Sequence, residues 1–124
     1  MEDIVFKSDD LVVMSLINYF ITEKNYNPMI IHGLNDEIWL ENLNEDYKIV
    51  RIVSHHIHNK EQLDFDKFKL SRIVKQVKKK TLSFKVKVLS IYTDLEDDKI
   101  LSNDDIYINK EEDINNPKLT NVFP

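Results

Sequence analysis

Apolar and polar residues follow two different periods along this chain, and the period separates the expected helices from the expected strands. Between residues 9 and 24, apolar side chains recur at helical spacing and form one broad face. Ser8 is a suitable cap for such a helix, and Asp9 and Asp10 place acids in its first turn. Pro28 disfavours the helical conformation at the residue before it, so we expect the helix to end near residue 24.

Three strand-like segments follow this helix. The short apolar run at 29–33, which ends at the only glycine, predicts the first strand. The runs at 36–43 and 46–53 are rich in β-forming residues, and the polar turn between them predicts a hairpin. Both faces of the second run are largely apolar, which indicates a strand covered by helices on both sides. Trp39 lies in the first run, and we expect it in the core, with a partner contact as the alternative.

The segment from 61 to 80 returns to the helical period. Its lysines fall mostly between the apolar positions, so it predicts a long basic helix. The pattern over 83–94 predicts another strand, half exposed at its start and buried at its end. The stretch 105–109 is interpreted as a short strand or a turn. The apolar positions assigned to the helix are Leu63, Phe65, Phe68, Leu70, Ile73, Val74 and Val77.

The resulting order of elements is α-β-β-β-α-β. We therefore predict an α+β fold with a mixed central sheet and helices packed on it, resembling a degenerate restriction-endonuclease-like core. A chain of 124 residues has the length of one domain. We expect residues 1–124 to form a single soluble domain, with an ordered core over about 8–93 and weaker order in the acidic segment 94–124.

Composition removes several classes of chemistry. Because the chain has no cysteine and one glycine, disulfides, thiolate sites, glycine-rich phosphate loops and Gly-x-Ser nucleophile turns are excluded. The longest apolar stretch, at 11–21, is shorter than the roughly 18–20 residues that cross a bilayer. The acidic N-terminal segment is unlike a secretory signal, so we expect no export.

Charge is distributed unevenly along the chain. Residues 67–87 carry nine basic side chains and no acidic one, which leaves 8 basic and 22 acidic residues elsewhere. The simpler interpretation is a solvated helix face that pairs loosely with acidic loops. The alternative is a surface for polyanions, either nucleic acid or the anionic leaflet of a membrane. The candidate residues for that surface are Lys75, Lys78, Lys79 and Lys80.

Three of the four histidines, His55, His56 and His58, follow the second strand of the predicted hairpin. Together with Asp64 or Asp66 they offer nitrogen and oxygen ligands for a divalent transition metal. The alternative is simpler, because polar residues commonly end a strand and the sequence does not place the ligands together. A divalent cation is the only cofactor that the sequence suggests.

A second constellation combines Asp36 with Asp46 and Lys48 at the heads of the two hairpin strands. An acid on one strand and Asp-x-Lys on the next resembles the site of restriction-endonuclease-like nucleases, whose acids bind magnesium and whose lysine assists the attacking water. Asp-x-Lys is also frequent in a charged chain, and here it falls in a turn. The sequence therefore favours an inactive relative of that fold over an active nuclease.

Three segments carry a family resemblance: "NYFITEKNYNP" at 18–28, "DEIWLENL" at 36–43 and "YKIVRIVS" at 47–54. Together they resemble the N-terminal cytoplasmic domain of rhomboid-family intramembrane serine proteases of Gram-positive bacteria and their relatives. The likeness continues through "IHNKEQLDFD" at 57–66 and the basic helix to the final "NVFP", and so covers most of the chain. The hairpin is its most specific part.

In that family a domain of this kind precedes a bundle of transmembrane helices that holds a serine–histidine catalytic dyad. No residue of this sequence matches the dyad, so the resemblance implies a non-catalytic regulatory or interaction domain that ends, at Pro124, just before membrane entry. It implies a place on the cytoplasmic face of the bacterial cell membrane. The expected partners are the protease domain of the same chain, an anionic membrane surface or a protein substrate, and not nucleic acid. The alternative function is that of a nucleic-acid-binding or nuclease-like protein.

Overall fold

The computed structural model of this chain describes residues 11–29, 37–81, 87–101, 105–109, 114 and 119, with side chains described for all of these except 77–81 and 98. The elements follow the predicted α+β order, with one additional strand after it. In chain order they are α1 (Leu11–Glu23), β1 (Asn27–Met29), β2 (Ile38–Glu41), β3 (Tyr47–Val53), α2 (Lys60–Thr81), β4 (Lys87–Tyr92), the short 3-10 helix η1 (Asp98–Ile100) and β5 (Asp105–Tyr107).

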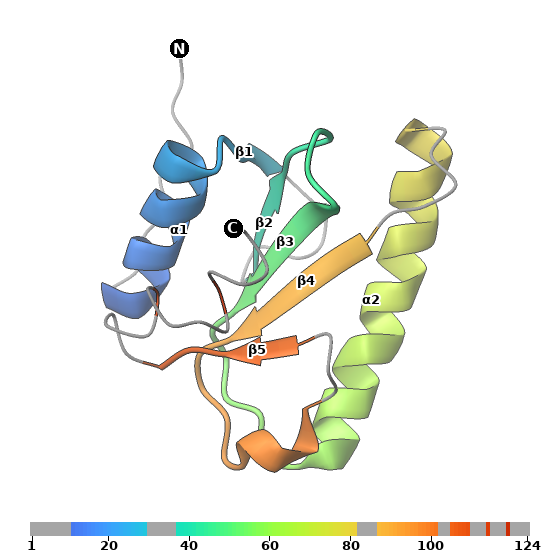
Figure 1. The fold of residues 1–124 in the computed structure, drawn as a ribbon. Helices are drawn as coiled ribbons and strands as arrows, with labels where there is room; N and C mark the ends of the chain where they lie inside the picture. Colours follow the sequence, from blue (N-terminus) through green and yellow to red (C-terminus); the bar gives the residue numbers. More distant parts are fainter. Residues whose placement is uncertain are drawn as a thin grey trace.

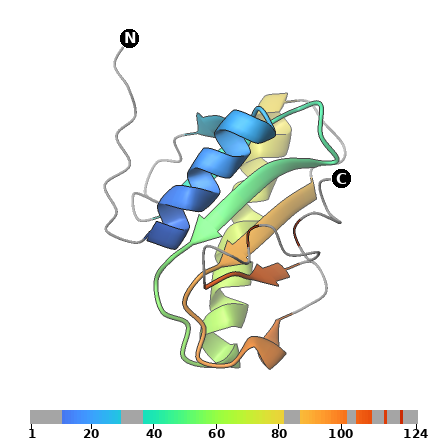
Figure 2. The ribbon, with the colours of Figure 1, turned by 60° about the vertical axis from the view of Figure 1, so that its left-hand side comes forward.

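The strands form one mixed sheet in the order β1-β2-β3-β4-β5. The pairs β1–β2 and β2–β3 are antiparallel, whereas β3–β4 and β4–β5 are parallel. Parallel neighbours need a long crossover connection, and α2 supplies it between β3 and β4. Figure 1 shows the sheet between the two helices, and Figure 2 shows α1 in front of the sheet with α2 behind it.

The face of the sheet that α1 covers is apolar. Side chains alternate across a strand, so every second residue of the central strands points to this side. The sheet contributes Leu40, Val50, Ile52, Leu89, Ile91 and Ile106, and α1 contributes Val13, Leu16, Ile17, Tyr19 and Phe20. Ile108, Ile114 and Leu119, which follow β5, complete this cluster.

The face that α2 covers is divided into three parts. One apolar cluster, around Val53, Leu63 and Tyr92, lies at the end of β3. A second cluster joins Trp39 and Ile49 to half-buried residues of α2. Between the two clusters, buried polar and charged side chains line the contact between α2 and the sheet.

Local signals explain where the helices begin and end. α1 ends because Asn25 adopts a left-handed conformation, with φ of 60°, and the Tyr26 amide then donates to the carbonyl of Phe20. Pro28 lies within β1 and is not the residue that ends the helix. α2 begins at a side-chain cap, since the Asn59 side-chain oxygen accepts from the Gln62 amide and the Gln62 side chain accepts from the His58 amide.

Three sequence predictions are corrected. The first strand begins at Asn27, two residues before the predicted start at Met29; residues 30–33 of the predicted strand lie outside the described part of the chain, together with Ser8, Asp9 and Asp10. Phe65 and Phe68 are exposed, because at 3.6 residues per turn they lie opposite Leu63 and Leu70 on the helix. The core also extends beyond residue 93, since β5 pairs with β4 and buried side chains follow it.

Candidate functional site: a buried arginine between two carboxylates

One row of neighbouring residues crosses the α2-covered face of the sheet. Trp39 of β2 pairs with Arg51 of β3, Arg51 pairs with Ser90 of β4, and Ser90 pairs with Asp105 of β5. Residues paired in this way point to the same face of a sheet. Arg51 is 1% exposed in this row, surrounded by otherwise apolar strands.

The guanidinium of Arg51 is held by two carboxylates from different elements, Glu37 beside the start of β2 and Asp66 in α2. Its Nη1 donates to Oε1 of Glu37 at 2.9 Å and to Oδ1 of Asp66 at 2.8 Å. Its Nη2 donates to Oδ2 of Asp66 at 2.6 Å, so the arginine and the aspartate form a two-pronged pair. Ser90 Oγ lies 3.3 Å from Nε and 3.1 Å from Nη2, and the Tyr92 hydroxyl lies 3.1 Å from Nη2. All five N–H groups therefore have acceptors.

The charges of this group fix its protonation states. Burial disfavours the charged form of Arg51, but the hydrogen bonds and charges of its partners outweigh burial and raise the pKa of its guanidinium. Burial likewise acts to raise the pKa of Asp66, but the hydrogen bonds and charge of Arg51 prevail and lower it. Burial is the main reason that the pKa of Tyr92 is raised, so its hydroxyl stays protonated and donates to Asp66 Oδ2 at 2.7 Å. The cluster thus holds the Arg51 cation, the Asp66 anion and the neutral phenol of Tyr92.

The next residue of α2 repeats the pairing with opposite signs. Lys67 forms an ion pair with Asp105, whose side chain is 1% exposed. On α2 the acid Asp66 is followed by the base Lys67. On the sheet their partners have the opposite charges, the base Arg51 and the acid Asp105. Opposite charges at adjacent positions specify both the rotation and the height of α2 on the sheet, because a shift of one residue brings like charges together.

Trp39 lies beside this group, and its burial confirms the predicted core position. The carbon of the Arg51 guanidinium lies 5.9 Å from the Trp39 ring centre, within the range of a cation–π contact. Within the described part of the chain, the indole Nε1 is a buried donor without an acceptor. The ring therefore serves as an apolar and π-electron wall for the guanidinium.

The chemistry of this site is that of a closed ionic lock. Arg51, Asp66, Ser90 and Tyr92 are each at most 2% exposed, so very little of their surface is open to solvent, although Asp66 contributes to the wall of a surface pocket. The guanidinium also occupies the space between the two carboxylates that a metal ion would need. The hydrogen bonds of Arg51 connect four elements: the start of β2, the middle of β3, β4 and the second turn of α2.

The nuclease-like constellation is not assembled around this lock. Ile38, at the start of β2, pairs with Ile52 near the end of β3, whereas Glu41, at the end of β2, pairs with Ile49. Asp46 and Lys48 precede Ile49 and therefore lie at the far end of the hairpin from Ile38, roughly 13 Å along the strand. Asp36 lies outside the described residues. No carboxylate pair with a neighbouring lysine results from the described positions.

The histidines follow β3, as the sequence indicates, but they do not converge as ligands. His55 and His58 are exposed, and the rings of His56 and His58 meet edge to face at 4.2 Å between centres. His56 bonds to acids on both sides, Nδ1 to Asp94 Oδ1 at 2.8 Å and Nε2 to Glu96 Oε2 at 3.1 Å. The hydrogen bond to Asp94 is the main reason that the pKa of His56 is raised. Among the described residues, no three acidic or histidine side chains form a group able to hold a metal ion.

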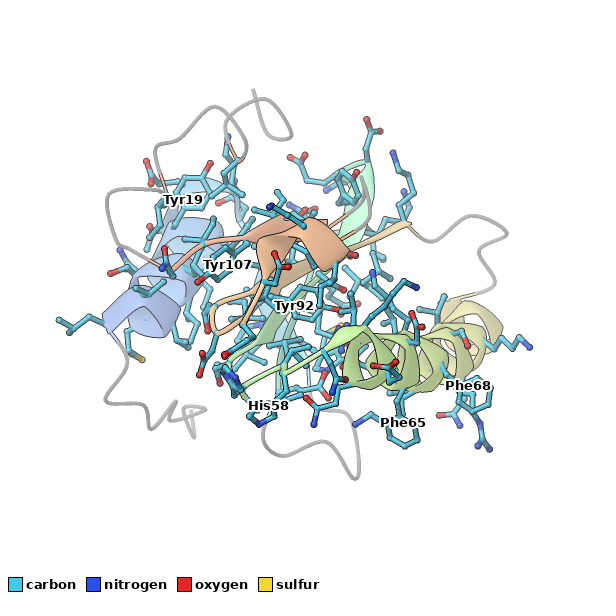
Figure 3. The ribbon with its side chains drawn as sticks, turned by 90° about the horizontal axis from the view of Figure 1, so that it is seen from below. Tyr19, His58, Phe65, Phe68, Tyr92 and Tyr107 are labelled. Atoms are coloured by element: carbon cyan, nitrogen blue, oxygen red, sulfur yellow. The ribbon has the colours of Figure 1, made fainter. Side chains whose placement is uncertain are left out.

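A surface pocket of about 470 Å³ opens beside these histidines. Its walls come from the loop after β3 and from the first turns of α2, and they include His55, His56, Gln62, Phe65 and Lys69. Of the four lysines assigned to an anionic surface, Lys75 is exposed, whereas the side chains of Lys78, Lys79 and Lys80 lie outside the described part. Figure 3 shows Phe65 and Phe68 on the side of α2 that faces away from Tyr92 and the sheet.

The ion pairs of Arg51 with Glu37 and Asp66, which form the lock, were not predicted from the sequence. A lone arginine in a run of apolar strand residues was the available signal. Asp66 gave another, because it lies three residues after Leu63 and four before Leu70, on the buried side of the helix. Both signals mark buried charges, but only the fold shows that the two charges meet.

Comparison with known proteins does not assign the chain to a family. No protein-family model matches the sequence, and no curated protein shows significant sequence similarity to it. In the part of the chain that the structure describes, neither helix combines the length and the apolar character that crossing a bilayer requires.

Proposed function

We propose that this chain is a non-catalytic regulatory and interaction domain of a rhomboid-like intramembrane serine protease. The observation that carries the non-catalytic part is the lock at Arg51, in which every guanidinium donor is used and every partner is buried. A restriction-endonuclease-like enzyme needs acids that are open to a metal ion and to water. Here an internal cation pairs with Glu37 and Asp66, so these two acids are not available as metal ligands, which supports the non-catalytic proposal.

The proposed setting is the cytoplasmic face of the bacterial cell membrane. The domain would contact the transmembrane protease domain of the same polypeptide and recruit a protein substrate or respond to a ligand, with a divalent cation as one candidate. The sequence segments at 18–28, 36–43 and 47–54 support this setting. The outer surface of the domain then carries the function, while the lock holds the shape of that surface.

The first experiment asks whether the domain belongs to a membrane protein. The coding sequence after codon 124 should continue in frame into several apolar segments of about 20 residues. An antibody against this chain should detect a polypeptide larger than 14.8 kDa that stays in the membrane pellet after carbonate extraction. A stop codon after Pro124, with the antigen in the supernatant, contradicts the proposal.

The second experiment separates regulation from catalysis. In the full-length gene, deletion of codons 1–124 should change the rate at which a reporter transmembrane substrate is cleaved, while mutation of the membrane serine should abolish cleavage. The isolated chain should leave plasmid DNA intact with magnesium or manganese present. Cleavage that requires a metal ion and is lost in Lys48→Ala would instead support the nuclease-like alternative.

A further inference from the structure

The outward side of α2 carries two exposed phenylalanines that the sheet does not use. Phe65 is 64% exposed and Phe68 is 59% exposed, on a helix of 22 residues. Residues three apart on a helix are neighbours, so the two rings form one apolar ridge. Two exposed aromatic side chains on one ridge are costly to leave in water, which marks the ridge as a contact surface.

Cations continue the same side of the helix. Arg72 follows Phe68 by four residues, and Lys75 follows Arg72 by three. These helical spacings keep the side chains on one face. Both are exposed, and Lys69 places its ammonium group 5.8 Å from the centre of the Phe65 ring. Among the described residues, no carboxylate forms an ion pair with Lys69, Arg72 or Lys75. We call Phe65, Phe68, Lys69, Arg72 and Lys75 the basic-aromatic face.

The acids of α2 lie at its other end. Glu61 and Asp64 precede Phe65, and Asp64 is paired with Lys60. From Lys67 to Lys87 the sequence has no acidic residue, although the chain as a whole has a net charge of −5. The molecule is therefore polarised, and this polarity turns the basic-aromatic face toward an anionic plane and the acidic remainder away from it.

We propose that the basic-aromatic face of α2 docks on an anionic lipid bilayer, with Phe65 and Phe68 in the interfacial region and Lys69, Arg72 and Lys75 at the phosphate level. Aromatic side chains flanked by long cationic ones match this interface, because the rings enter the headgroup boundary and the cations reach the phosphates. Each cation near such a surface strengthens binding roughly fivefold. The inference deepens the proposed function, because it names the membrane surface as the partner of the domain. Its evidence is the basic-aromatic face alone.

The shape of the face favours a bilayer over a nucleic acid. Single strands bind in charged grooves that follow the backbone, with aromatic platforms on which bases stack. Here Phe68 lies on the outer side of the helix away from the pocket, and the pocket that Phe65 and Lys69 border also includes the exposed acid Glu61, which would repel a phosphate backbone. A bilayer needs no groove, since it accepts side chains from a convex surface.

The test uses the complete chain and vesicles of defined composition. The wild type should float with phosphatidylcholine vesicles that contain phosphatidylserine and should not float with phosphatidylcholine alone. Phe65→Ser/Phe68→Ser should weaken binding at least about tenfold, because it removes the inserted area. Arg72→Gln/Lys75→Gln should weaken it roughly twenty-fold at low salt and little at high salt.

Leu43 provides the matched control. It is 57% exposed, but it lies in the β2–β3 turn near Glu41, Glu45 and Asp46. Leu43→Ser should therefore leave flotation unchanged. In a Phe68→Trp variant, indole emission should shift to shorter wavelength with anionic vesicles, which reports insertion directly. All five substituted positions are exposed, so the variants should unfold at the wild-type temperature.

Three outcomes overturn the inference: equal binding to both vesicle types, unchanged binding of Phe65→Ser/Phe68→Ser, or tighter binding of a single-stranded oligonucleotide than of vesicles. Each of these leaves the membrane-protein test above unaffected, because that test depends on the gene after codon 124. Conversely, vesicle binding by the isolated chain stands even if no transmembrane segment follows. Failure of the docking surface and failure of the proposed function are therefore distinguishable.

Discussion

The two faces of the sheet solve the same packing problem in different ways. On the α1 side, apolar side chains from both layers fill the interface, and no charge is buried in that cluster. On the α2 side, Arg51, Asp66 and Asp105 are nearly inaccessible, and apolar clusters lie to either side of them. Apolar packing tolerates some rearrangement, whereas a buried charge is costly without its partner, so the ion pairs disfavour positions of α2 that separate them. Apolar contacts hold α1 on the sheet. On the other face, the ion pairs also favour one position of α2.

This difference matters for the outer face of α2. The basic-aromatic face has a fixed orientation only if the opposite face of the helix is fixed on the sheet. Asp66 and Lys67, which pair with the sheet, lie between Phe65 and Phe68 in the sequence. The lock therefore sets the direction in which the two phenylalanines point, and damage to the lock should reach the surface that we propose to dock.

The largest expected effect comes from breaking the lock on one side only. Arg51→Met should lower the free energy of unfolding by about 3–5 kcal/mol, because it leaves the carboxylates of Glu37 and Asp66 buried without a cation. Chemical denaturation at neutral pH, followed by far-UV circular dichroism, measures the change. The triple variant Arg51→Met/Glu37→Gln/Asp66→Leu should recover most of the loss. A cost below about 1 kcal/mol for Arg51→Met would show that the lock adds little.

On the α1 side, removal of a single apolar side chain should cost somewhat less. Leu40 is fully buried in β2, and Leu40→Ala should lower the free energy of unfolding by about 3 kcal/mol through lost burial and the cavity left behind. The same denaturation measurement applies, with Leu43→Ala as the exposed control. The loss should be the same at pH 4 and pH 7 since no charge is involved. A strong pH dependence would argue against a purely apolar face.

The apolar face that α1 covers was easier to predict from the sequence than the buried charges on the face that α2 covers. The helical period of 11–23 and the alternation of 47–53 depend on local spacing, so they predicted α1, β3 and the two covered faces. The end of α1 near residue 24 was predicted, but its cause, the left-handed Asn25, and the position of the short edge strand β1 were not, because both depend on contacts that spacing does not encode. The helical period placed Phe65 and Phe68 among the apolar positions of α2 without separating them from the buried ones, and the structure shows that both are exposed.

The lock was missed for a related reason. Glu37, Arg51 and Asp66 are separated by 14 and 15 residues, and only the pairing of β2 with β3 and the return of α2 bring them together. The histidine cluster shows the converse case. Residues adjacent in sequence left a metal site and a simple strand end open as alternatives, and the fold directs His56 toward Asp94 and Glu96.

Acid should act on the α2 side of the sheet through Asp66. Its pKa is lowered in the folded state, so its contribution to stability is present above the unfolded pKa of about 3.9 and is lost as the pH falls through the lower, folded value. Wild-type stability should therefore fall as the pH drops below about 4. Asp66→Asn should be less stable at neutral pH and should show a shallower slope across this range. Equal slopes in both proteins would mean that other carboxylates dominate acid unfolding.

The smallest expected effect lies at the end of the α2 side, where His56 connects the loops after β3 and β4. Its pKa is raised, chiefly by the hydrogen bond to Asp94, so its stabilising contact is present below about pH 6.5 and is lost as the pH rises through the folded value. The Ile57 amide donates to the Asp94 carbonyl and the Glu96 amide donates to the Ile57 carbonyl, so these two amides report on the loops. Their hydrogen-exchange protection, corrected for intrinsic rates, should decrease as the pH rises from about 6 to 8. In Asp94→Asn the pKa of His56 should fall and this pH dependence should weaken, whereas Asp64→Asn should change neither, because Asp64 is paired with Lys60 on α2. Protection that is independent of pH in the wild type would show that the backbone bonds alone hold the two loops together.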